Sequence, residues 1–166
     1  MARFANKSVI VTGGNSGIGR AAALQFAREG ANVVVAARRE AEGNAVVDEI
    51  KSSGGEAIFT KVDVASSQDV QNMVGRCVET YGGLDYAFNN AGMVGEDFGQ
   101  IENYSETAWQ RVVDVNLTGV FLCMKYQIPK MLERGGGAIV NMASVSGLKG
   151  SRGGAAVYAA TKHGVI

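Results

Sequence analysis

The two residues of this chain best suited to proton transfer are Tyr158 and Lys162, in the segment YAATK. Four positions apart on a helix, their side chains share one face. A tyrosine with its ordinary pKa of roughly 10 is a poor base at neutral pH, but a nearby ammonium stabilises the phenolate and lowers that pKa. The pair could therefore act as a tuned acid and base. Because a Tyr-x-x-x-Lys spacing is common on helices, the pair in isolation also fits a structural role.

A second candidate is the loop TGGNSGIG at residues 12–19, which follows the apolar run SVIV. One explanation for so many glycines is a tight turn, where glycine supplies positive φ without steric cost. The other is a phosphate group that lies on the backbone amides of a helix N-terminus. The spacing G-x-x-x-G-x-G differs from the common G-x-G-x-x-G fingerprint. Both explanations remain open from the loop alone, whose glycines are Gly13, Gly14, Gly17 and Gly19.

A third candidate lies at the end of the apolar run VVVAA, where dinucleotide-binding folds place an acidic residue against the adenosine ribose. This chain has Ala37 near that position, followed by Arg38 and Arg39. A guanidinium presents a planar fork of donors that suits a ribose 2′-phosphate. The pattern favours NADP(H), with NAD(H) as the alternative cofactor. The simpler interpretation is a solvated basic start to the next helix, in which Glu40 pairs with either arginine.

Composition excludes several classes of function. The 16 basic and 16 acidic side chains balance, so we expect no partner that is a nucleic acid or an anionic membrane. His163 is the only histidine, which excludes a His-based metal cluster and a Ser-His-Asp triad. Cys77 and Cys123 lie far apart, so neither a disulfide framework nor a zinc site is encoded, and we expect no metal. The apolar run before the glycines is too short for a signal peptide, and we expect a cytoplasmic protein.

The elements that must position these residues alternate along the chain. Short apolar runs that are typical of buried strands are separated by segments of helical period. We predict strands at 8–12, 32–37, 57–63, 84–92 and 137–144, and helices at 18–28, 40–54, 66–82 and 105–134 and from about Gly154 onward. Ser66 or Ser67 would cap the third helix. The one long irregular stretch is 91–105.

This alternation predicts an α/β fold, a doubly wound parallel sheet with helices on both faces. No repeat, linker or low-complexity segment interrupts residues 1–166, so we expect one domain. Ligands of such sheets bind beyond the carboxyl ends of the strands, where the strand order reverses. The glycine loop follows the first strand and therefore lies at that crevice.

Five motifs together resemble those of the short-chain dehydrogenase/reductase family. The loop TGGNSGIG matches the family's TGxxxGxG, and NNAG at 89–92 matches its fourth-strand motif. VNLTG contains the family's helix asparagine, Asn116; IVNMASVSG carries its serine, Ser144; and YAATK carries its Tyr-Lys pair. The resemblance runs from residue 12 to residue 162 in the family's order. It implies a Rossmann-like dinucleotide-binding domain with strand order 3-2-1-4-5.

The resemblance also implies roles for individual residues. Asn116, Ser144, Tyr158 and Lys162 would form the catalytic set. Tyr158 would exchange a proton with the substrate oxygen, Ser144 would polarise the carbonyl, and Asn116 would position a water that relays protons through Lys162. Lys162 would also bind the nicotinamide ribose. The implied cofactor-binding residues are Gly13, Asn15, Ser16, Gly17, Ile18, Gly19, Arg38, Arg39, Asp63, Val64, Asn90, Ala91, Gly92, Tyr158 and Lys162, with Asp63 and Val64 beside the adenine.

Several of these assignments have structural alternatives. Asn89 and Asn90 could simply end a strand by bonding backbone groups, and Asn116 could be an ordinary polar helix residue. Ser146 competes with Ser144, because the spacing from Ser144 to the tyrosine is one residue longer than many family members show. Trp109 and the methionines are expected to pack in the core.

The sequence therefore predicts an NADP(H)-dependent oxidoreductase that interconverts an alcohol and a ketone or aldehyde, with a small-molecule substrate. The alternatives are a family member with isomerase or dehydratase chemistry and a non-catalytic dinucleotide-binding module. We expect the full-length protein to be a homo-oligomer, either a dimer or a tetramer. Because the chain stops four residues after Lys162, we also expect it to lack the family's C-terminal strands, to leave its fifth strand as an exposed edge, and to be inactive by itself.

Overall fold

The computed structural model describes residues 2–95, 100–150 and 155–166. Five parallel strands form one sheet in the order β3-β2-β1-β4-β5, as predicted. The strands are β1 (Ser8–Thr12), β2 (Asn32–Ala37), β3 (Glu56–Lys61), β4 (Tyr86–Asn89) and β5 (Ala138–Asn141). The predicted strands at 57–63, 84–92 and 137–144 were too long. In each case the chain leaves the sheet at a polar or small residue and continues as a loop toward the candidate site.

Six α-helices connect and follow these strands within the described residues. They are α1 (Gly17–Arg28), α2 (Glu40–Ser52), α3 (Ser67–Tyr81), α4 (Glu106–Val113), α5 (Gly119–Leu132) and α6 (Ala156–Val165). Ser66 caps α3, since its Oγ accepts a hydrogen bond from the Asp69 N–H (3.2 Å). The final helix starts at Ala156, two residues after Gly154, which agrees with the prediction; Gly154 itself lies outside the described residues.

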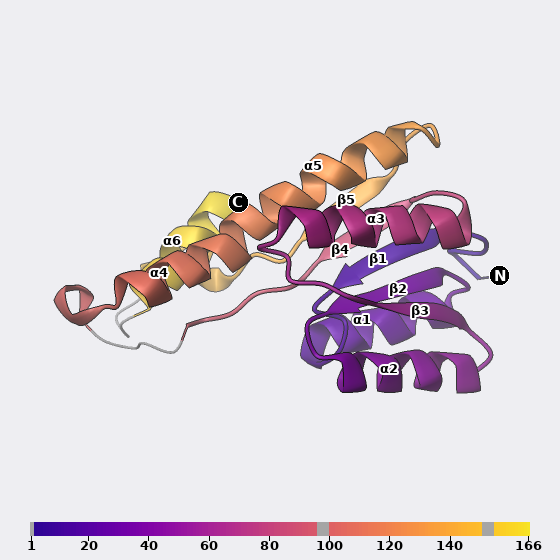
Figure 1. Ribbon diagram of the computed structural model, residues 1–166, viewed down its shortest axis with the longest axis horizontal. Helices are drawn as coiled ribbons and strands as arrows, with labels where there is room; N and C mark the ends of the chain where they lie inside the picture. Colours follow the sequence, from indigo (N-terminus) through magenta and orange to yellow (C-terminus); the bar gives the residue numbers. More distant parts are fainter. Residues whose placement is uncertain (1, 96–99, 151–154) are drawn as a thin grey trace.

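The predicted helix at 105–134 is divided by a π-helical segment. Between α4 and α5, residues Asp114–Thr118 wind as a π-helix, which closes i→i+5 hydrogen bonds. The three pieces follow one another without a break, so they form one long, locally widened helix (Figure 1). This segment carries Asn116, one of the predicted site residues.

The sheet is buried between two helical layers (Figure 1). Helices α1 and α2 cover one face, where Val9, Val11, Val33 and Val35 point into an apolar cluster. Helices α3 and α5 cover the other face, where the alternate residues Ile10 and Val34 join a second cluster that includes Met73 and Met131. The alternation follows from the two-residue period of a strand. Helices α4 and α6 extend beyond the carboxyl ends of the strands (Figure 1).

Strand β5 lies at one edge of the sheet. Within the described residues it pairs only with β4, and Val140 is 61% exposed. Beside it lies an apolar groove whose walls include Phe4, Phe26 and Tyr86. The expectation of an exposed fifth strand therefore agrees with this structure.

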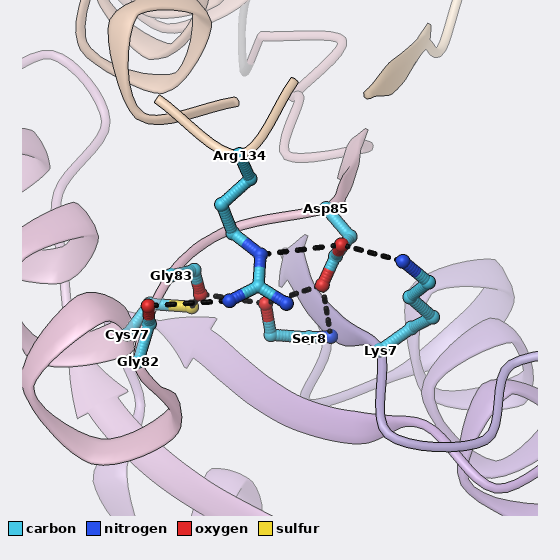
Figure 2. Close-up of polar contacts among 7 residues, drawn as sticks. All are labelled: Lys7, Ser8, Cys77, Gly82, Gly83, Asp85 and Arg134. Carbon is cyan, nitrogen blue, oxygen red and sulfur yellow. Dashed lines mark hydrogen bonds and ion pairs between the residues drawn. The ribbon is translucent and has the colours of Figure 1, made fainter. Parts of the chain in front are cut away.

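A polar cluster around Asp85 lies at the amino ends of β1 and β4, at the end of the sheet opposite to the glycine loop (Figure 2). The Asp85 carboxylate accepts hydrogen bonds from Lys7 Nζ (3.0 Å), the Ser8 N–H (3.0 Å) and Ser8 Oγ (3.2 Å). Arg134, just after α5, places its Nε 3.4 Å from the same carboxylate and donates from Nη1 to the Gly82 carbonyl (3.3 Å). The cluster ties β1, the start of β4 and the end of α5 together, far from the glycine loop.

Candidate active site

The glycine loop joins β1 to α1 by a turn that side chains would block. Gly13 and Gly17 have positive φ angles, 64° and 53°. A Cβ on Gly19 would overlap the Gly13 carbonyl and lie 2.5 Å from Asn90 Nδ2. Positive φ and close approach are both conditions that favour glycine. The loop therefore places backbone atoms that no side chain covers at the carboxyl end of β1.

Thr12 and Asn90 fasten this loop to the end of β4. Thr12 Oγ1 accepts hydrogen bonds from the backbone N–H of Asn90 (3.0 Å) and of Ala91 (3.1 Å). The Asn90 side chain donates back to the carbonyl of Thr12 (3.0 Å). Thr12 was not among the predicted site residues, although it opens the TGGNSGIG motif. Its position as the last residue of a strand beside a glycine loop is the signal that could have identified it.

A pocket of about 410 Å³ lies above the glycine loop at the carboxyl ends of β1, β2 and β4. Eleven of the predicted cofactor-binding residues line it: Gly13, Asn15, Ser16, Ile18, Arg38, Arg39, Asp63, Val64, Asn90, Ala91 and Gly92. Gly17 and Gly19 shape the loop without lining the pocket, and Tyr158 and Lys162 lie outside its wall. The apolar lining residues Ala36, Ala37, Val62 and Val115 were not predicted to bind the cofactor.

The two arginines of this pocket have different surroundings. Arg39 is held against the glycine loop, because Nη2 donates to Ser16 Oγ (3.3 Å) and Nε pairs with Glu42 (3.1 Å). With its amide oxygen turned toward the guanidinium, Asn15 accepts from Nε (3.0 Å) and Nη2 (2.7 Å) of Arg39. The acid that pairs with Arg39 is thus Glu42, two residues beyond the expected Glu40. Arg38 is exposed at the pocket wall.

Asp63 is fixed at the rim of the pocket by Arg111 of α4. Its carboxylate accepts from Arg111 Nη2 (2.6 Å) and from the Ala65 N–H (3.0 Å). Partial burial acts to raise the pKa of Asp63, but these hydrogen bonds and the charges of Arg111 and Arg38 outweigh burial and lower it. Asp63 is therefore an oriented carboxylate at neutral pH.

Lys162 is buried beside Tyr158 on α6. Its Nζ donates to the Met142 carbonyl (2.6 Å), lies 5.8 Å from the centre of the Tyr158 ring, and the residue is 3% exposed. Burial lowers the pKa of Lys162, since the charged form is disfavoured away from water. Tyr158 itself is half-buried. The structure thus brings the two residues of the predicted acid–base pair together.

Asn116 lies in the π-helical segment and is fully buried. Its Oδ1 accepts from the Met93 N–H (2.9 Å), and its Nδ2 donates to the Met93 carbonyl (2.8 Å) and to Thr161 Oγ1 (3.2 Å). A Cβ on Gly92 would lie 3.3 Å from Asn116 Oδ1 and 3.7 Å from Lys162 Nζ. The side chain of Asn116 therefore joins the loop after β4 to α6, next to Lys162.

Ser144 follows β5 and begins a 3₁₀ turn at Val145–Gly147. Its Oγ accepts from the Ser146 N–H (3.2 Å), a bond that does not use the hydroxyl proton. Gly147 packs against α6 so closely that a Cβ there would lie 2.5 Å from the Lys162 carbonyl. Of the two competing serines, Ser146 contributes its backbone to this turn, and Ser144 contributes its side chain.

Two negative findings apply to the described residues only. In them, no helix has the length and apolar character needed to cross a membrane. Within the same residues, no three His, Cys, Asp or Glu side chains gather closely enough to hold a metal ion.

Comparison with known proteins gives consistent matches over the whole chain. A family model described as short chain dehydrogenase matches residues 7–166. Cyclohexanol dehydrogenase of Acinetobacter sp. (strain SE19) is 45% identical over 163 residues, which are 98% of this chain and 64% of that protein. The 3beta-hydroxysteroid dehydrogenase of Mediterraneibacter gnavus is 43% identical over 165 residues, 99% of this chain and 59% of that protein.

Solved structures agree in fold as well as in sequence. Levodione reductase superposes with a TM-score of 0.91 at 37% identity, covering 98% of this chain and 63% of that one. A variant of actinorhodin polyketide ketoreductase, solved with NADPH, gives a TM-score of 0.92 at 40% identity, with 99% and 63% coverage. The chain spans less than two thirds of the length of these proteins.

Proposed function

The chain belongs to the short-chain dehydrogenase family, and on that premise we propose that it interconverts an alcohol and a ketone or aldehyde with NADP(H). The observation that carries this proposal is the Lys162 ammonium, which is buried against the Met142 carbonyl and 5.8 Å from the Tyr158 ring. Burying an ammonium is costly unless it is hydrogen-bonded. Its place beside a tyrosine is the arrangement that an acid–base pair requires.

The proposed roles follow from the chemistry of each side chain. NADPH supplies the hydride to the carbonyl carbon, and NADP⁺ accepts it in the reverse direction. As the carbonyl π bond breaks, its electron pair takes the proton of the Tyr158 hydroxyl, and oxidation returns that proton to Tyr158. Lys162 favours the resulting phenolate by its charge. The Ser144 hydroxyl donates to the substrate oxygen and stabilises the charge that develops there.

The pocket above the glycine loop supports the choice of cofactor. Bare backbone at Gly13 lets a diphosphate approach the start of α1, where the helix dipole favours negative charge. Arg38 and Arg39 line the same pocket, and β2 ends at Ala37 without a carboxylate. We therefore propose NADP(H) over NAD(H), because a 2′-phosphate suits guanidinium donors. One structural relative, the actinorhodin polyketide ketoreductase, was solved with NADPH.

Two other functions fit the same family and pocket. Isomerase or dehydratase chemistry would use the same cofactor, and a non-catalytic module would bind it without turnover. The non-catalytic module is disfavoured by the intact set Asn116, Ser144, Tyr158 and Lys162, since a binding module has no need of an acid–base pair.

We also propose that residues 1–166 form a dinucleotide-binding domain of a cytoplasmic homo-oligomer. The relatives are named for cyclohexanol and a 3beta-hydroxysteroid, so ring ketones are sensible first substrates.

The test separates cofactor binding from turnover. NADPH fluorescence is titrated with the protein, and oxidation of NADPH is then followed across ketones and aldehydes that include cyclohexanone. In a complete, active version of the protein, Tyr158→Phe removes the transferable proton and should lower turnover at least about 100-fold while NADPH binding survives. Tyr81→Phe, on α3 and away from the pocket, is the matched control. Binding without turnover in that complete version would favour the module, and full activity of its Tyr158→Phe variant would remove tyrosine from the mechanism.

A further inference from the structure

Three side-chain amides form a cluster between α5 and the ends of β4 and β5. Asn89 Nδ2 donates to Gln127 Oε1 (3.1 Å), and Gln127 Nε2 donates back to Asn89 Oδ1 (2.9 Å). Asn89 Nδ2 also donates to Asn141 Oδ1 (2.9 Å). Gln127 is fully buried and Asn89 is 2% exposed. The two bonds between Asn89 and Gln127 therefore form away from water, where an amide that loses its partner is costly, and the bond to Asn141 is partly buried.

Gln127 is a polar residue on an otherwise apolar face of α5. Cys123 lies one turn before it and Met131 one turn after it, and both belong to the apolar cluster that covers this face of the sheet. A leucine at position 127 would bury more apolar surface, so apolar packing alone does not explain a glutamine there. What the glutamine adds is a reciprocal pair of hydrogen bonds that fixes the amide of Asn89.

The cluster connects to Lys162 through one strand end. Asn89 and Asn141 are register partners in the β4–β5 pair. The next residue, Met142, donates its N–H to the Asn89 carbonyl (2.9 Å) and accepts the Lys162 ammonium at its own carbonyl (2.6 Å). Since β5 is an edge strand of four residues, few other bonds hold this end in place. The position of the Met142 carbonyl thus depends on the amides directly before it.

We propose that Gln127 is a positioning residue for the acid–base pair: through Asn89 and Asn141 it fixes the end of β5, and so the carbonyl that holds Lys162. The role in catalysis rests on the proposed function, whereas the positioning itself is a property of the folded chain. Gln127 does not line the pocket above the glycine loop. In this proposal it acts through Met142, whose carbonyl accepts from Lys162.

The experiment compares Gln127→Met with Cys123→Ala by NMR on the isotope-labelled chain. Methionine has nearly the same volume as glutamine but breaks both amide bonds. Cys123→Ala opens space on the same helix face without removing an amide. The first readout is amide hydrogen exchange at Met142, referred to Val11 in the central strand. The second is the ammonium signal of Lys162, which is observable only while a hydrogen bond protects its protons from water, and which general loosening of the core would not selectively remove.

In Gln127→Met we expect exchange at Met142 to accelerate about 10-fold or more relative to Val11, since a lost buried hydrogen bond is worth about that factor. The Lys162 signal should weaken in parallel, and Cys123→Ala should change neither ratio. Should Gln127→Met fail to fold, Asn141→Ala removes the outer amide bond, together with the bond from Asn141 Nδ2 to Met124 Sδ (3.3 Å), and should move both readouts in the same direction. Unchanged Met142 exchange and Lys162 signal in the folded variant would overturn the inference. Failure of the unmodified protein to bind NADPH would instead contradict the proposed function.

Discussion

A Cβ on Gly19 would overlap the carbonyl oxygen of Gly13, so the two ends of the glycine loop are in direct backbone contact. Gly19→Ala must therefore displace the glycine loop or Asn90. We expect NADPH affinity to fall at least about 10-fold, and the free energy of unfolding to fall by about 1 to 3 kcal/mol, the usual cost of overpacking. NADPH fluorescence and urea unfolding measure the two effects.

The control is Gly75→Ala in α3, where a Cβ meets nothing within 4 Å and where alanine should be neutral or stabilising. Equal NADPH affinity in the two variants would mean that the loop does not contact the cofactor.

The arginines at the end of β2 predict which cofactor is preferred. Ala37→Asp combined with Arg38→Leu places a carboxylate where a 2′-phosphate would lie and removes one guanidinium. NADPH should then bind more weakly and NADH more tightly, because the carboxylate repels phosphate and accepts hydrogen bonds from a free 2′-hydroxyl. Dissociation constants for both cofactors measure the change. Arg76→Gln, an exposed arginine on α3, controls for the loss of positive charge alone. A parent protein that already prefers NADH would contradict the interpretation of the arginines.

Arg39 should respond differently from Arg38. It is bound to Ser16 and Glu42 beside the loop, whereas Arg38 stays exposed at the pocket wall. We expect Arg39→Gln to weaken NADPH and NADH alike, since it releases the glycine loop that both cofactors use. Arg38→Gln should weaken mainly NADPH. The ratio of the two dissociation constants distinguishes the cases, and equal ratios for the two variants would show that the arginines act as one site.

Both cysteines should be inert in the folded protein. Burial raises the pKa of the Cys77 thiol to about 12 and that of the Cys123 thiol to about 12 as well. Because the thiolate is the reactive form, a thiol reagent at pH 8 should label neither residue quickly. Both should react within the same time in urea. Rapid labelling of one cysteine without denaturant would show that its helix opens in the native state.

The sequence predicted the sheet well because its signals are local and repeated. Apolar strands alternating with helices lead to a parallel sheet, and the order of five strands agreed with the prediction. The comparisons confirm the family resemblance that the five motifs carried. The π-helical turn at Asp114–Thr118 was not predicted. A π-helical turn adds one residue to an α-helical turn, and this insertion leaves no distinct pattern in the amino-acid composition.

Site residues that belong to a sequence motif could be predicted. Residues that act only through hydrogen bonds to other residues were harder to predict. Gly13 and Asn90 could be named from their motifs. Thr12 was missed although it opens the glycine-loop motif. Gln127 could not be named, since it acts through hydrogen bonds to Asn89, a residue far away in sequence. The assignment of catalytic and cofactor-binding roles remains a prediction, for which the structure supplies the distances and the experiments above supply the tests.

The Asp85 cluster at the far end of the sheet should make stability depend on pH (Figure 2). Burial acts to raise the pKa of Asp85, but hydrogen bonds from Ser8 and Lys7 and the charge of Arg134 outweigh it, so the folded pKa is lowered. A carboxyl group with a lowered folded pKa contributes its stability above its unfolded pKa, roughly 3.9. That contribution is lost as the pH falls through the folded value.

Asp85→Asn tests this contribution, because the amide keeps the shape of the side chain and removes its charge. At pH 7 the variant should lose about 1.5 to 3 kcal/mol of unfolding free energy, the range for hydrogen bonds to a charged group. As the pH is lowered toward 3, the parent protein should lose stability faster than the variant, and the gap between them should narrow. Asp48→Asn, on the exposed face of α2, makes the same change of net charge and should leave the curve of the parent almost unaltered. Urea unfolding from pH 7 to pH 3 gives all three curves. A gap between parent and Asp85→Asn that stays constant over this range would mean that the shape of Asp85, and not its charge, holds β1 to β4.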